Sequence, residues 1–183
     1  MSAEVLVKNP VTTGSLKAST SRLDQQQPPK IHYNAISKMN IHIEAGGFHF
    51  LAQTNPEAPI TVTAFLKLLP YRQKLIHVRW SGEGCWVPLG DFVLEQDGKA
   101  IGFENATSHP APGEILFYPG GYSETEIILA YGACCFASKL GQLAGNHFLT
   151  IIEGQENLRT LGKKTLWEGA QDVVFRLAPS AAT

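Results

Sequence analysis

The stretch Ile41-His42-Ile43-Glu44-Ala45-Gly46-Gly47-Phe48-His49-Phe50 has the pattern of a β-hairpin. Apolar and polar side chains alternate on both sides of two glycines, which supply the positive φ angles that a tight turn needs. Further strand patterns follow at residues 74–80, 92–95, 100–103, 114–118, 126–131, 147–152 and 173–177. Many short strands separated by turns are typical of a sandwich or a barrel, so the sequence predicts a mainly β fold.

Two segments have the spacing of short helices. Apolar residues fall on one helical face at Val62, Phe65, Leu66 and Leu69. Thr61 is expected to cap this helix and Pro70 to stop it. A second helix is predicted over residues 156–161, ended by Gly162. The strands do not alternate regularly with helices, which argues against a doubly wound α/β fold.

Composition restricts the class of protein. The chain has 183 residues, 44% of them hydrophobic, which suits the core of one domain. The formal net charge of −1 argues against a nucleic-acid partner. No apolar run of about 18 residues occurs, so no membrane partner is expected. Three cysteines without regular spacing are unlike a disulfide framework and favour a cytoplasmic location.

The composition changes near Met39. Residues 1–38 are rich in Ser, Thr, Gln and Pro, and they contain too few apolar side chains to offset the entropy lost on ordering. They are predicted to be a mostly disordered extension, with an organelle transit peptide as the alternative. Residues 39–178 are predicted to form one domain, and residues 179–183 a short tail.

Four longer motifs carry a resemblance to a known family. They lie at residues 79–90 (RWSGEGCWVPLG), 118–126 (YPGGYSETE), 143–148 (LAGNHF) and 166–171 (LWEGAQ). These segments resemble a microbial domain-of-unknown-function family with a cyclophilin-like fold. The resemblance spans about residues 39–178 and implies a closed antiparallel β-barrel with helices over its openings. It does not imply prolyl isomerase activity, because the active-site segments of true cyclophilins are absent.

The first candidate site follows the strand at residues 74–80. If Ile76, Val78 and Trp80 fill the barrel, His77 and Arg79 face outward or into a cleft. An arginine on a rigid strand can hold a carboxylate by two parallel hydrogen bonds, although an ion pair with a nearby acid is equally expected.

A glycine-rich turn is expected directly after this strand. Glu83 lies in it and is a candidate base, with an ordinary solvated glutamate as the alternative. Trp80 and Trp86 flank the turn and are predicted to wall a ligand pocket.

The second candidate site is the loop before residues 126–131. Gly120 and Gly121 permit backbone angles at which exposed amides bind an anion. Glu124 and Glu126 are placed on one face, where one carboxylate raises the pKa of the other and the pair can act as acid and base. Solvated loop acids are the alternative. The two candidate loops are expected to meet, with Arg79 and the acids bordering one cavity.

Two further residues complete the candidate set. Tyr131 ends the strand after this loop and is assigned to ligand binding. His147 is the best candidate for a general base because histidine titrates near neutral pH, although a structural hydrogen-bonding role is the more common one. No spacing typical of metal ligands and no nucleotide-binding motif occurs, so neither a metal nor another cofactor is expected.

The candidate residues favour a protein that binds a small anionic metabolite between the two loops. The resemblance adds an amide-bearing metabolite, because related cyclophilin-like domains occur in enzymes that act on urea-like amides. Hydrolysis or isomerisation of that ligand is one extension of this hypothesis. A non-catalytic binding or accessory subunit is the main alternative, and a peptidyl-prolyl isomerase ranks last. The sequence leaves formation of a homo-oligomer open.

Overall fold

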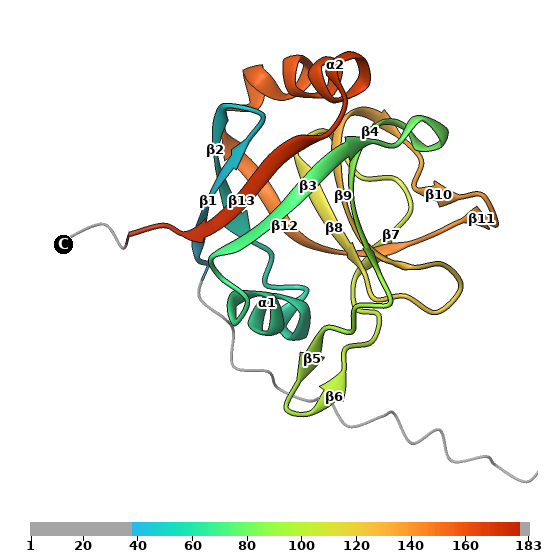
Figure 1. Cartoon of the computed structure of the whole chain (residues 1–183). Helices are drawn as coiled ribbons and strands as arrows, with labels where there is room; N and C mark the ends of the chain where they lie inside the picture. The colour runs from blue at the N-terminus through green and yellow to red at the C-terminus, as the bar shows by residue number, and fades with distance from the viewer. Residues whose placement is uncertain (1–37, 180–183) are drawn as a thin grey trace, which may run out of the picture. The chain divides into compact units, whose positions relative to one another are not determined.

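The computed structural model describes residues 38–179, and the predictions for the N-terminal extension and most of the tail lie outside them. Eight strands form a closed antiparallel barrel in the order β2-β1-β13-β3-β4-β9-β8-β12, with β12 pairing back to β2 (Figure 1). This confirms the predicted mainly β barrel. The barrel strands are β1 (Asn40–Ala45), β2 (Phe48–Thr54), β3 (Tyr71–His77), β4 (Gly82–Gly90), β8 (Glu114–Tyr118), β9 (Thr125–Cys134), β12 (Gly145–Glu153) and β13 (Gln171–Leu177).

Short strands and two helices complete the domain. The two-residue strands are β5 (Glu95–Gln96), β6 (Lys99–Ala100), β7 (Ala106–Thr107), β10 (Ala137–Ser138) and β11 (Gly141–Gln142). Helix α1 (Pro59–Leu66) and helix α2 (Leu158–Glu168) lie at opposite ends of the barrel (Figure 1). No helix in the described residues is long and apolar enough to cross a membrane.

Apolar side chains form two clusters, one on each side of the barrel wall. The larger cluster lies inside the barrel and includes Phe50, Phe65, Phe117 and Phe148. The smaller one lies on the outer surface of β4, β8 and β9, where Trp86, Leu116 and Ile128 pack beneath Phe136 and Leu143.

Helix α1 begins three residues earlier than the sequence predicts, and its cap comes from a distant loop. The Glu104 carboxylate accepts hydrogen bonds from the Thr61 backbone amide at 2.6 Å and from its hydroxyl at 2.7 Å. The buried Asn146 amide also donates to Thr61 Oγ1, at 2.9 Å. Thr61 is therefore inside the helix, and a carboxylate stabilises the helix N-terminus in its place.

Replacing Glu104 with Ala is expected to lower the free energy of unfolding by about 1 kcal/mol, because α1 loses its cap. Urea denaturation of the two proteins would measure the difference. Glu57→Ala is the matched control, because Glu57 is an exposed acid near α1 that does not cap it. Equal losses in the two variants would contradict the capping role.

Helix α2 runs through Gly162, which the sequence predicts as its end. Gly162 is buried against the ring of Tyr131 from β9, and a Cβ atom there would lie 2.5 Å from two ring carbons. The glycine is thus needed for close packing of the helix on the barrel. The helix ends instead before Gly169, whose φ of 88° favours glycine.

Gly162→Ala is therefore expected to destabilise the protein by about 1 kcal/mol. An overpacked methyl group costs about 1–3 kcal/mol, and the higher helix propensity of alanine offsets about 1 kcal/mol of that. Thermal or urea unfolding would measure the change. Combining Gly162→Ala with Tyr131→Leu should remove most of the penalty, and strictly additive losses would argue against this contact.

The glycine-rich segment after β3 is a strand and not the turn that the sequence predicts. A short 3₁₀ turn, Arg79–Ser81, follows β3, and β4 then starts at Gly82. A Cβ on Gly84 would lie 3.3 Å from Cys134 Sγ, so glycine allows β4 to approach β9 closely. The chain reverses direction two to three residues earlier than expected.

Candidate functional site

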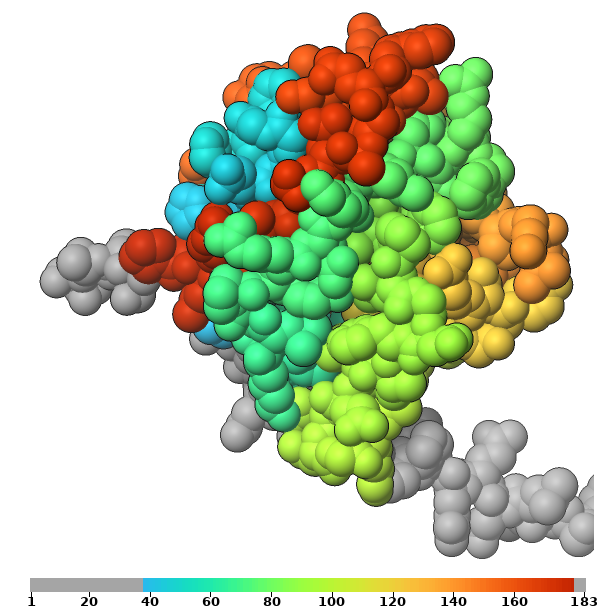
Figure 2. All heavy atoms as spheres, viewed as in Figure 1, coloured from blue at the N-terminus to red at the C-terminus, as the bar shows by residue number. Residues whose placement is uncertain are grey.

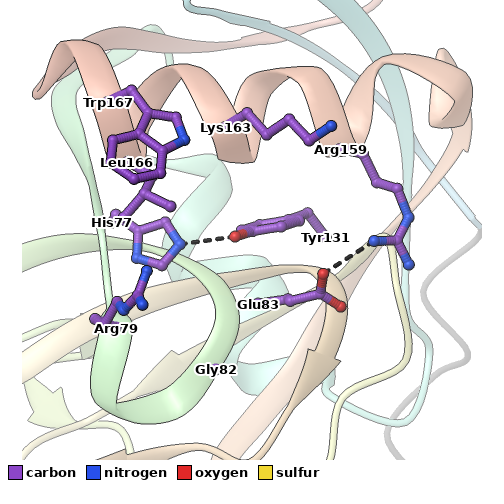
Figure 3. Close-up of a pocket in the computed structure, with 9 residues that line it drawn as sticks. All are labelled: His77, Arg79, Gly82, Glu83, Tyr131, Arg159, Lys163, Leu166 and Trp167. Atoms are coloured by element: carbon purple, nitrogen blue, oxygen red, sulfur yellow. Dashed lines mark hydrogen bonds and ion pairs between the residues drawn. The ribbon is translucent and has the colours of Figure 1, made fainter.

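A pocket of about 380 Å³ lies between helix α2 and one end of the barrel. We call it the helix pocket. Its lining residues are His77, Arg79, Gly82, Glu83, Tyr131, Arg159, Lys163, Leu166 and Trp167. Figure 3 shows the α2 side chains above, with His77, Tyr131 and Glu83 below them. In Figure 2 the red atoms of α2 lie beside the green atoms of the β3–β4 segment. The volume of the helix pocket is in the range of ~300–1,000 Å³ that is common for small-ligand sites.

One face of α2 supplies the upper wall of the helix pocket. Arg159, Lys163 and Trp167 recur at intervals of four residues, so they lie on the same side of the helix. The Trp167 side chain is 78% exposed. The sequence analysis missed these residues because it ended the helix at Gly162, although their spacing was a usable signal.

Glu83 is engaged in two interactions at the lower wall. One carboxylate oxygen accepts a hydrogen bond from the Ala133 amide at 2.8 Å, and the other pairs with Arg159 at 2.9 Å. The Ala133 amide and, to a smaller extent, Arg159 lower the pKa of Glu83. Glu83 is therefore ionised at neutral pH and is a weak proton acceptor.

The pocket carries an excess of positive charge. Within the part of the chain that the structure describes, neither Arg79 nor Lys163 forms an ion pair with an acid. Glu83 balances only Arg159, so the other two cations remain uncompensated. Such a pocket attracts an anion.

A histidine and a tyrosine form a close pair in the same pocket. His77 Nε2 lies 2.7 Å from the Tyr131 hydroxyl, and His77 Nδ1 is buried without a partner among the described residues. Burial, with a smaller contribution from Arg79, lowers the pKa of His77. Burial also raises the pKa of Tyr131. At pH 7 both groups are thus neutral, and one hydrogen bond joins His77 Nε2 to the Tyr131 hydroxyl.

A second pocket, of about 250 Å³, lies on the outer surface of the barrel. We call it the tryptophan pocket. Its lining residues are Trp80, Trp86, Ser123, Glu124, Glu126, Ser138 and Lys139. The two tryptophan rings pack edge to face with centroids 5.6 Å apart. The structure thus brings together the two rings that the sequence predicts as a pocket wall.

The candidate residues are distributed over the two pockets and not around one cavity. Arg79, Glu83 and Tyr131 line the helix pocket, whereas Glu124 and Glu126 line the tryptophan pocket. The orientation of strand β3 also differs from the expected one. Leu75 faces the barrel interior, and Trp80, which was expected to fill the barrel, is 58% exposed. The strand ends at His77, and the 3₁₀ turn sends Arg79 and Trp80 to different pockets.

His147 lies outside both pockets. Its ring nitrogens are 3.2 Å from Asn55 Nδ2 and 2.8 Å from Thr150 Oγ1, and Glu114 is 3.7 Å away. These contacts are those of a structural histidine, and its role as a base stays a prediction.

Gly120 and Gly121 do not line either pocket, although both have the positive φ that the sequence predicts. The two backbone amides that follow Gly121, those of Tyr122 and Ser123, donate hydrogen bonds to the Tyr118 hydroxyl at 3.2 and 3.3 Å. Those amides are thus already occupied. Among the described residues, no group of three or more His, Cys, Asp or Glu side chains could hold a metal ion.

The sequence over residues 41–177 matches the family described as protein of unknown function (DUF3830). Comparison with curated proteins gives no match. Among solved structures, the chain is similar to McbB, determined in complex with tryptophan, with 18% identity and a TM-score of 0.54. That match covers 78% of this chain and 46% of McbB, so this chain spans about half the length of that protein.

A second solved structure, the hypothetical protein AF2241 from Archaeoglobus fulgidus, has 17% identity and a TM-score of 0.51. The match covers 77% of this chain and 95% of that one. At these identities both likenesses concern the fold alone.

Proposed function

Because this chain belongs to the family of proteins of unknown function DUF3830, whose description assigns no reaction, we propose its function from the geometry of the helix pocket. The protein binds a small organic anion, a carboxylate with an aromatic or apolar body. The observation that carries this proposal is the pairing of two uncompensated cations, Arg79 and Lys163, with the apolar walls of one pocket.

Each part of such a ligand has a counterpart in the pocket. The Arg79 guanidinium can donate two parallel hydrogen bonds to a carboxylate, and Lys163 adds a flexible positive charge from the opposite wall. Leu166 and Trp167 offer apolar surface to the rest of the ligand. Tryptophan, the ligand of McbB, combines a carboxylate with an aromatic ring and is a suitable probe.

Spectra of ¹⁵N-labelled protein would test this binding. The chain has three tryptophans, and only Trp167 lines the helix pocket, so its indole N–H signal reports on that site. Benzoate, indole-3-acetate and tryptophan are added in separate titrations. Benzamide and indole-3-acetamide are the matched neutral probes.

Binding of the carboxylates with a shift of the Trp167 signal is the expected result. The acids should bind about tenfold or more tightly than their amides, because a charge-assisted hydrogen bond is stronger than a neutral one. Equal affinity for acid and amide would contradict the role of the cations. Shifts confined to Trp80 and Trp86 would contradict the assignment to this pocket.

Proton transfer on the bound anion is a second candidate function, favoured by the His77–Tyr131 pair in the same pocket. Neutral His77 is the candidate base, because the Glu83 carboxylate is held by the Ala133 amide and Arg159, which lower its pKa. Incubating indole-3-acetate and tryptophan in D₂O would test this function, because both carry hydrogen on the carbon next to the carboxylate. Exchange that His77→Gln abolishes would support isomerase chemistry, and no exchange would support a non-catalytic binding protein.

A further inference from the structure

The tryptophan pocket has a chemistry opposite to that of the helix pocket. It lies between strand β4, the start of strand β9 and the β10–β11 hairpin. Figure 2 shows the orange atoms of this hairpin beside the yellow-orange atoms of the loop before β9. The Tyr122 hydroxyl joins the two segments by a hydrogen bond to the Leu140 carbonyl.

Glu126 is the most unusual residue of this pocket. Only 4% of its surface is exposed, and it forms no ion pair with any described residue. Its carboxyl oxygens are not among the buried atoms that lack a partner, so the little surface that they expose faces the tryptophan pocket. Trp86 Nε1 is near enough to lower the pKa of this carboxyl, but it does not reach hydrogen-bond geometry and is itself buried without a partner. A carboxyl group that is this shielded and has no ion-pair partner can accept a charged donor that enters the pocket.

The neighbouring groups also fit a donor with a positive charge. Glu124 uses one oxygen to accept a hydrogen bond from the Gly90 amide at 3.1 Å, which leaves the other available. Trp80 and Trp86 present aromatic rings, whose faces attract cations. Lys139 is exposed on the hairpin and forms no ion pair with either acid in the described residues.

We propose that the tryptophan pocket binds a small primary alkylammonium ion, which donates hydrogen bonds to Glu126 and Glu124 while its carbon chain lies against Trp80 and Trp86. The site is independent of the anion-binding function proposed above. Its volume of about 250 Å³ suits a small ligand. The Lys139 ammonium group can stay in water because the lysine side chain is long and flexible.

Binding at this site is coupled to the loss of a proton. Burial and the adjacent Glu124 raise the pKa of Glu126 to about 8, so its carboxyl group is neutral at pH 7. When the ammonium ion binds, Glu126 releases its proton to solvent and the carboxylate pairs with the cation. The other titratable groups around it are Glu124, Lys139 on the hairpin and Tyr118 on the adjacent strand β8. Affinity should therefore rise from pH 6 to pH 9.

Ethylammonium chloride is the probe for this proposal, with sodium chloride at equal ionic strength as the control. The three indole N–H signals are followed in the full-length protein. Ethylammonium should shift the signals of Trp80 and Trp86 but not that of Trp167, and the affinity should increase with pH. Ethanol, a neutral analogue of similar size, should cause no comparable shift.

Glu126→Gln should weaken ethylammonium binding about tenfold or more and remove its pH dependence. Trp80→Ala, at a largely exposed ring, should weaken it severalfold without loss of folding. Lys139→Gln should strengthen it, because a competing positive charge is removed. Equal shifts with sodium, or unchanged affinity in Glu126→Gln and Trp80→Ala, would overturn the proposal. A Trp167 shift alone would place the cation in the other pocket and also overturn it.

Discussion

Glu126→Gln is expected to make the protein more stable than wild type at pH 8.5, by about 2–4 kcal/mol. The reason is the raised pKa of Glu126, about 8 in the folded protein against an ordinary value of 4.5. The folded state therefore holds a proton that the unfolded state has lost. Stability is fully retained below about pH 4.5 and decreases as the pH rises through 8, where the buried carboxyl must ionise.

The size of this effect follows from the pKa shift. A difference from 4.5 to about 8 corresponds to at most about 5 kcal/mol, since each pKa unit is equivalent to 1.36 kcal/mol. Water reaches the carboxyl group through the tryptophan pocket, so the smaller range is expected. Glutamine has the shape of the protonated side chain and cannot ionise.

Urea denaturation of wild type and Glu126→Gln at several values between pH 4 and pH 9 would measure this difference. The two proteins should have similar stability near pH 4.5 and diverge as the pH increases. Glu95→Gln is the matched control, because Glu95 is exposed and lies outside the tryptophan pocket. If the free energies of unfolding of wild type and Glu126→Gln changed with pH in parallel, burial would not hold this carboxyl in its neutral form.

The fold was predictable where its signals are local. Gly46-Gly47 directs the β1–β2 hairpin through φ angles of 57° and 88°, and the flanking alternation places Ile41 and Ile43 in the core. The four long motifs also identified the family, which the match over residues 41–177 confirms. These features depend on short-range geometry or on long specific segments.

Strand β4 could not be predicted in the same way, because glycine has low β-propensity and commonly occurs in turns. Gly82 and Gly84 lie in a strand because β9 approaches them closely, a contact between residues about fifty positions apart. The same limit applies to Gly162, whose small size matters only because Tyr131 lies against it. Long-range packing decides these positions.

The candidate site was predicted in its parts but not in its arrangement. The motif around Arg79, Trp80 and Glu83 does border pockets, as the sequence suggested. The end of β3 determines which pocket each residue joins, and a 3₁₀ turn changes the alternation that a continuous strand would have. An error of two or three residues in one strand end thus turns one expected cavity into two.

Arg79→Ala is expected to weaken binding of an aromatic carboxylate about 10- to 100-fold while leaving the fold intact. The substitution removes charge-assisted hydrogen bonds that contribute about 1.5–3 kcal/mol to binding. Arg79 is exposed and has no ion-pair partner among the described residues, so its removal breaks no structural interaction. Its melting temperature should therefore stay within a few degrees of the wild-type value.

Titration with benzoate, followed at the Trp167 indole signal, would measure the affinities of wild type, Arg79→Ala and Arg72→Ala. Arg72 is an exposed arginine on strand β3, outside the helix pocket, and controls for the loss of one positive charge. Arg79→Lys should bind with intermediate affinity, because lysine keeps the charge but not the two parallel hydrogen bonds. The pKa of His77 should also rise in Arg79→Ala, since the arginine lowers it in wild type. A strongly destabilised Arg79→Ala would make Arg79 a structural residue, and equal losses of affinity in Arg72→Ala would reduce its role to general charge attraction.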